Sequence, residues 1–84
     1  MIKQEFVNWA KSKGWEEDKF GHLHKTVGMR VYRFKVSTIS VRYEIQVNHP
    51  AGDYSPAKNE WIRLRSGYLK NLCINEDGKL SGLK

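Results

Sequence analysis

The spacing of apolar residues along the chain changes from helical to alternating after Phe20. Before that point, one apolar stripe recurs at helical intervals: Ile2, Phe6, Trp9 and Ala10. This spacing predicts an amphipathic helix of about three turns. Gly14 can adopt the left-handed conformation that ends a helix, with Trp15 folding back onto the last turn. The acidic run 16–18 reads as a solvated turn.

The middle of the chain has a period of two. Apolar and polar residues alternate from Ile39 to Val47 and again from Tyr32 to Val36, which indicates two strands, each with one buried and one wet face. A tight connection around Ser37 and Thr38 joins them. With both apolar sets on one face, the expected partners are Val36 with Ile39, Phe34 with Val41, Tyr32 with Tyr43, and Arg33 with Arg42.

A preceding strand, His22 to Val27, joins through Gly28 and Met29. Glycine at the first central position favours a type II′ turn. The expected partners are then Val27 with Arg30, Lys25 with Tyr32, His24 with Arg33, and Leu23 with Phe34. In this register His22 and His24 share the wet face with the arginines.

Residues 48–59 have the composition of a loop, including Pro50, Gly52 and Pro56. Further strands are expected over 61–65, with Ile62 and Leu64 inward, over 69–74, and, after a turn at 75–78, over 79–83. The sequence therefore predicts a single α+β domain, residues 1–84. In it, one N-terminal helix packs on one face of a mainly antiparallel meander sheet of five to six strands, and the other face is open.

The composition gives expectations about order, cellular location and membrane association. Its 84 residues are 39% hydrophobic and 12% aromatic, which argues against disorder. A lone cysteine, Cys73, cannot form an internal disulfide, so we expect a reducing, cytoplasmic location. No apolar run has the length of a signal-peptide core or a membrane span, and we expect no membrane association.

The net charge of +6 favours an anionic partner, either nucleic acid or an acidic protein, and five of the six net charges lie between Thr26 and Lys70. Guanidinium groups bind phosphates in a bidentate way, and an outward aromatic ring on a sheet can stack on an unpaired base. The candidate nucleic-acid-binding residues of the open face are His24, Arg33, Lys35, Arg42, Trp61, Arg63 and Arg65. In the alternative interpretation, Glu44, Glu60 and water neutralise these charges and Trp61 covers an edge of the core.

His22 and His24 are also candidates for metal binding or for an acid–base pair that cleaves RNA. The other candidate ligands, His49, Asp53 and Cys73, lie at distant positions without a recognisable spacing, so no metal site is predicted. Phosphate-loop, nucleophile-elbow and dinucleotide motifs are absent from the sequence. We therefore expect no cofactor and assign no catalytic residue.

The order of a helix, Gly14-Trp15 and then Gly21-His22-Leu23-His24 on the first strand resembles the HicA family of small toxins. The resemblance covers about the first third of the chain, and it implies a ribonuclease with a double-stranded-RNA-binding-like fold and a strand histidine. Strand-like sequence stands where that family has its second helix. The whole sequence is also similar in style to short uncharacterised proteins of Gram-positive bacteria and their phages.

Three functional hypotheses follow from these observations. The first is a small non-enzymatic module that binds nucleic acid through its basic open face. The second is a HicA-like ribonuclease that uses His22 or His24. The third is a protein-interaction module, such as a phage-type inhibitor that uses its basic face to mimic or occlude a nucleic-acid site on a host protein.

Overall fold

The N-terminal helix ends where the sequence predicts. In the computed structural model, which describes residues 1–84, α1 spans Lys3–Ser12. Gly14 has a φ of 93°, a conformation that strains any side chain, and its N–H donates to the carbonyl of Lys11. The N–H of Trp15 donates to the carbonyl of Ala10, which confirms the folding back of the chain. Helix α1 is too short and too polar to cross a lipid bilayer.

The face that α1 buries differs slightly from the expected stripe. Phe6, Val7 and Ala10 are buried, whereas Ile2 is 63% exposed. Ile2 precedes the first helical residue, so the helical spacing does not apply to it. The prediction that Ile2 belongs to the buried stripe is wrong.

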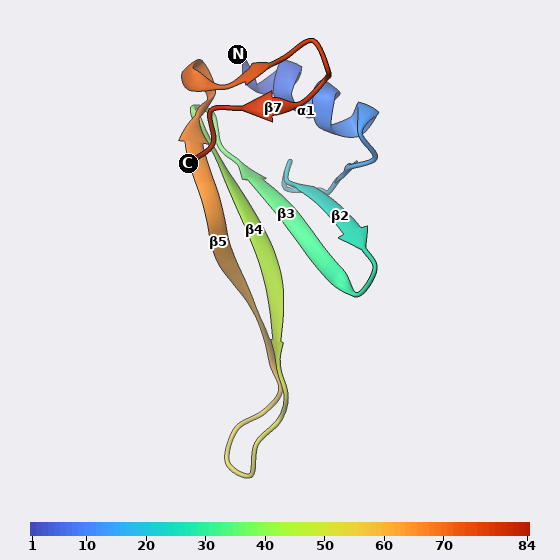
Figure 1. The fold of residues 1–84 in the computed structure, drawn as a ribbon. Helices are drawn as coiled ribbons and strands as arrows, with labels where there is room; N and C mark the ends of the chain where they lie inside the picture. Colours follow the sequence, from blue (N-terminus) through green and yellow to red (C-terminus); the bar gives the residue numbers. More distant parts are fainter.

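Five antiparallel strands form the main sheet in the order of the chain (Figure 1): β1 (Glu16–Glu17), β2 (Leu23–Val27), β3 (Arg30–Val36), β4 (Ser40–His49) and β5 (Lys58–Tyr68). The predicted α+β class and meander topology are confirmed. β1 is an addition, because Glu16 and Glu17 pair with His24 and Leu23 instead of forming a solvated turn.

The β2–β3 hairpin has the predicted turn and register. Gly28 has a φ of 62° and Met29 does not have a positive φ, as a type II′ turn requires. Leu23 lies opposite Phe34, and His24 lies opposite Arg33. The polar face of this hairpin is therefore the one that the sequence predicts.

The β3–β4 register differs from the prediction by two residues. Val36 lies opposite Val41, and Arg33 lies opposite Glu44 instead of Arg42. The turn has the expected length but lies one residue further along the chain, because the N–H of Ser37 donates to the carbonyl of Ser40 and the central residues are Thr38 and Ile39 instead of Ser37 and Thr38. A shift of two keeps every side chain on its face but changes its partner. Val41 is consequently fully buried, and Ile39 is 66% exposed.

The C-terminal segment departs from the predicted strand over 69–74. Its first half is a 3-10 helix, η1 (Leu69–Asn71), and only β6 (Cys73–Ile74) is extended. β6 pairs with β7 (Leu80–Ser81) in a separate two-stranded sheet. The 3-10 turn is closed by the N–H of Leu72 donating to the carbonyl of Leu69, and it turns both leucines into the core.

The core lies at one end of the main sheet, where α1, β2, β3, β4 and η1 meet. A helix of ten residues is only about 15 Å long, so the β4–β5 hairpin projects beyond it (Figure 1) and the molecule measures 50 × 24 × 23 Å. We call the side of the sheet away from α1 the outer face. It carries no helix.

Candidate nucleic-acid interface

Six of the seven candidate residues lie together on the outer face. The register brings them there in cross-strand pairs: His24 with Arg33, Lys35 with Arg42, Arg63 with Glu44, and Trp61 with Gln46. They come from four neighbouring strands, β2 to β5, so residues up to 39 positions apart in the chain, His24 and Arg63, share one surface.

Arg65 is the exception, and its expected outward position is wrong. Along β5, Arg63 is the partner of Glu44 and Arg65 is the partner of Tyr43, so Leu64 is an extra residue in a β-bulge. A bulge interrupts the alternation of faces. Arg65 therefore shares the helix-facing side with Tyr43, while Arg63 stays on the outer face.

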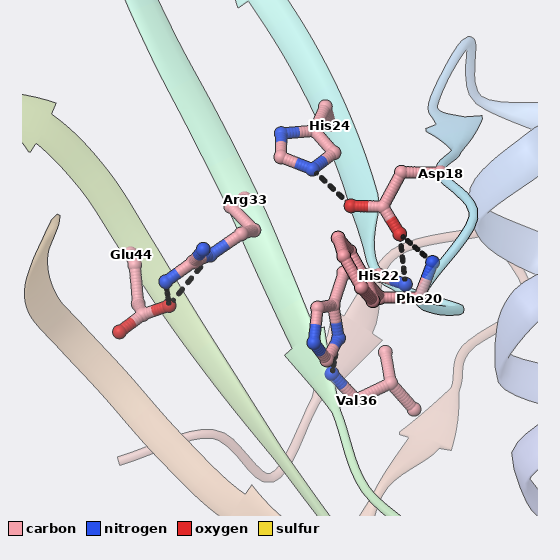
Figure 2. Close-up of polar contacts among 7 residues, drawn as sticks. All are labelled: Asp18, Phe20, His22, His24, Arg33, Val36 and Glu44. Carbon is pink, nitrogen blue, oxygen red and sulfur yellow. Dashed lines mark hydrogen bonds and ion pairs between the residues drawn. The ribbon is translucent and has the colours of Figure 1, made fainter.

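Arg33 is held by a carboxylate and is not a free cation. Its Nε and one terminal nitrogen both donate to Oε1 of Glu44, at 2.9 and 2.7 Å (Figure 2). The two side chains are only 17% and 6% exposed. The alternative interpretation, in which Glu44 neutralises a charge of the basic face, is therefore correct for Arg33.

Trp61 is half-buried, with one side of its ring already occupied. The guanidinium carbon of Arg33 lies 4.1 Å from the centroid of the indole ring, a cation–π distance. The ring of His24 meets the same indole edge-on at 5.8 Å. Trp61 thus supports the Arg33–Glu44 pair, and less of its surface is open to a base than the sequence suggests.

Lys35, Arg42 and Arg63 are the exposed cations of the outer face, and none forms an ion pair. Lys35 and Arg42 lie directly opposite each other, and like charges in this position repel. A shallow hollow of about 210 Å³ beside Arg42 is also lined by Ser40 and Ser66. An anion bound there would offset the repulsion between Lys35 and Arg42 and would lie near the two serine hydroxyl groups.

Asp18 is a structural residue that the sequence analysis missed. Its Oδ1 accepts the N–H groups of Phe20 and His22, at 2.8 and 2.9 Å, and the Nε2–H of His24 donates to Oδ2 at 2.6 Å (Figure 2). Burial acts to raise the pKa of Asp18, but these hydrogen bonds outweigh it and the pKa is lowered. Aspartate commonly binds the backbone two residues onward in turns, and this preference was the available signal.

The side chain of His22 is hydrogen-bonded to the backbone of the sheet. Its Nδ1 accepts the N–H of Val36 at 3.2 Å (Figure 2), which requires an unprotonated Nδ1. Burial, followed by the nearby charges of Arg33 and Lys35, lowers the pKa of His22 against the opposing effect of Asp18. The arrangement keeps the imidazole neutral. No three His, Cys, Asp or Glu side chains of the protein come together as a metal-ligand set.

No protein-family model matches the chain, and no solved structure matches it significantly.

Proposed function

We propose that this protein is a non-enzymatic module that binds nucleic acid through phosphate contacts at Lys35, Arg42 and Arg63. The observation that carries the proposal is the Lys35–Arg42 pair: two exposed cations held opposite each other without a carboxylate partner. Such an arrangement costs folding free energy unless an anion is bound. Successive phosphates of a nucleic-acid strand supply that charge.

The remaining residues of the outer face position these cations. The Arg33–Glu44 pair is the next outward-facing pair along β3 and β4 from Lys35–Arg42, and Arg63 lies opposite Glu44 on β5. Trp61 lies against the guanidinium group of Arg33. His24 lies at the β2 side, fixed by Asp18. In this proposal, Arg33 and Trp61 hold the shape of the surface, and the exposed cations contact phosphates.

Charge reversal at the Lys35–Arg42 pair tests the proposal. We expect Lys35→Glu plus Arg42→Glu to weaken binding of labelled single- and double-stranded oligonucleotides at least about tenfold, because two phosphate contacts become repulsive. Fluorescence anisotropy at low salt measures the affinity. In the Lys35→Ala plus Arg42→Ala variant, we expect the slope of log affinity against log salt to decrease by about two.

The matched control is Lys3→Glu plus Lys58→Glu, which makes the same charge change at exposed lysines away from the outer face. This variant should keep most of the affinity. Equal losses in both double variants would show that only net charge matters, and undetectable binding by the parent would overturn the proposal in favour of a protein partner. RNA that is cut during the assay by the parent but not by His24→Ala would favour the ribonuclease hypothesis instead.

A further inference from the structure

The helix-facing side of the sheet contains a cleft of about 770 Å³. None of the six candidate residues of the outer face lines this cleft. It lies between the end of α1, the Asp77–Leu83 segment, and the part of the sheet formed by β3, β4 and β5. Its volume falls in the range of small-molecule sites.

Aromatic rings form much of the wall of this cleft. Trp15 packs 4.3 Å from Phe34 and 6.3 Å from Tyr43, measured between ring centroids. The indole of Trp9 is fixed by donating its N–H to the carbonyl of Gly78 at 2.8 Å. The indole N–H of Trp15 and the hydroxyl of Tyr43 have no partner in the protein and are available to a ligand. The hydroxyl of Tyr43 is a donor at neutral pH, since the ordinary pKa of tyrosine is about 10 and burial raises the pKa of Tyr43 further.

The rim of the cleft is cationic. Lys13, Arg65 and Lys79 line it together with one acid, Asp77. Arg65 lies directly opposite Tyr43 and forms no ion pair. The cleft therefore combines an apolar aromatic wall with an exposed guanidinium group that has no carboxylate partner, which suits a planar ring that carries an anionic group.

We propose that this cleft binds an unpaired nucleobase together with its phosphate, from single-stranded nucleic acid or from a free nucleotide. Aromatic walls beside cationic grooves are the usual means of binding unpaired bases. The proposal deepens the proposed function and rests on it for the class of ligand.

The bulge at Leu64 connects the two surfaces. It places Arg63 on the outer face and Arg65 on the cleft side, two residues apart on β5. β5 is an edge strand, and beyond its pairing with β4 only Ser66 bonds further backbone, that of Lys84. A single strand can thus pass around this edge, with phosphates near Arg63 outside and near Arg65 inside.

The three tryptophan indole N–H signals in a ¹⁵N NMR spectrum test this proposal, because Trp15 reports on the cleft and Trp61 on the outer face. We expect a ten-nucleotide thymidine DNA strand to shift the Trp15 signal. An abasic strand with the same number of phosphates should leave Trp15 unmoved, since it has no ring to insert. If a free nucleotide is sufficient, thymidine 5′-monophosphate should shift the Trp15 signal as well. If the DNA strand shifts this signal and the monophosphate does not, the ligand is single-stranded nucleic acid and not a free nucleotide.

Arg30→Glu is the matched control for Arg65→Glu, since it makes the same change at an exposed arginine beside the β2–β3 turn that does not line the cleft. We expect Arg65→Glu to weaken the Trp15 response at least about fivefold, by loss of one charge-assisted phosphate contact, and Arg30→Glu to leave it nearly unchanged. Arg65→Lys should restore part of the response, because a point charge remains.

The outcomes separate this inference from the proposed function. If the DNA strand shifts Trp61 but not Trp15, the outer face binds and the cleft proposal is wrong. If Trp15 shifts while Lys35→Glu plus Arg42→Glu binds like the parent, the cleft binds and the outer-face proposal is wrong. An equal Trp15 shift with the abasic strand would also overturn the cleft proposal, because no base would then be needed.

Discussion

The Arg33–Glu44 pair lies on a sheet face that no helix covers, yet both side chains are largely removed from water. The ring of Trp61 and the neighbouring strands replace the solvent around them. A buried carboxylate is tolerated only when it is paired and hydrogen-bonded, and Glu44 accepts two bonds from Arg33. Glu44 is therefore a structural requirement of the outer face.

Glu44→Gln should destabilise the protein by about 1 to 3 kcal/mol, because the guanidinium group of Arg33 loses its charged acceptor while it stays mostly buried. Urea unfolding followed by tryptophan fluorescence measures this loss. The control is Glu60→Gln, which removes an exposed carboxylate 2.8 Å from His49 and should cost less than about 1 kcal/mol. Equal effects of the two changes would contradict the assigned role of Glu44.

His22 makes the stability depend on pH. Its folded-state pKa is lowered from 6.5, so the folded protein favours the neutral ring while the unfolded chain takes up a proton near pH 6.5. The contribution to stability is complete above pH 6.5 and is lost as the pH falls towards the folded-state pKa. We expect the urea midpoint of the parent to decrease between pH 7 and pH 5, and to decrease less in His22→Asn, whose amide oxygen can still accept the N–H of Val36.

His49→Asn is the comparison for this pH effect. The one side-chain hydrogen bond of His49 is with the exposed carboxylate of Glu60, and His49 does not hold the sheet backbone, so the pH effect assigned to His22 should remain in this variant. A parent-like pH dependence in His22→Asn would show that another group is responsible.

Among the elements, the β4–β5 hairpin has two different parts. Near the core, its strands complete the sheet and carry Arg42, Arg63 and Arg65. Beyond the Tyr32–Ile45 pair, no third strand accompanies it, and the two strands project to the tip at residues 50–57 (Figure 1). The projecting part contributes no residue to the buried core.

Shortening this projection should therefore leave the fold intact. Replacing residues 48–59 by Asn-Gly keeps the Val47–Glu60 pair and supplies a favoured two-residue turn. We expect the free energy of unfolding to change by less than about 1 kcal/mol, since loop length has a weak effect on stability. Thermal and urea unfolding measure the change, and failure of the shortened protein to fold would show that the projection stabilises the sheet.

The molecule as assembled presents two different surfaces on one thin sheet. The outer face offers isolated cations on a polar surface, and the other side offers an aromatic cleft beside the covering helix. The core occupies one end only, so much of the sheet is accessible from both sides (Figure 1). Under the two proposals above, a flexible single strand would contact both surfaces around the β5 edge, whereas a rigid duplex would contact the outer face alone.

Local features of the sequence determined the helix, its end at Gly14, the β2–β3 turn and the assignment of residues to the two faces of β2, β3 and β4. Each depends on spacing within a few residues or on the conformational freedom of glycine, and neither needs distant contacts. Tertiary structure decided the partner of Arg33, the position of Arg65 and the cleft around Trp15. The position of the Ser37–Ser40 turn and a single bulged residue set the first two. The cleft exists only because the Asp77–Leu83 segment returns to α1. Such choices depend on which register buries the most apolar surface and pairs Glu44, and alternation alone does not contain that information.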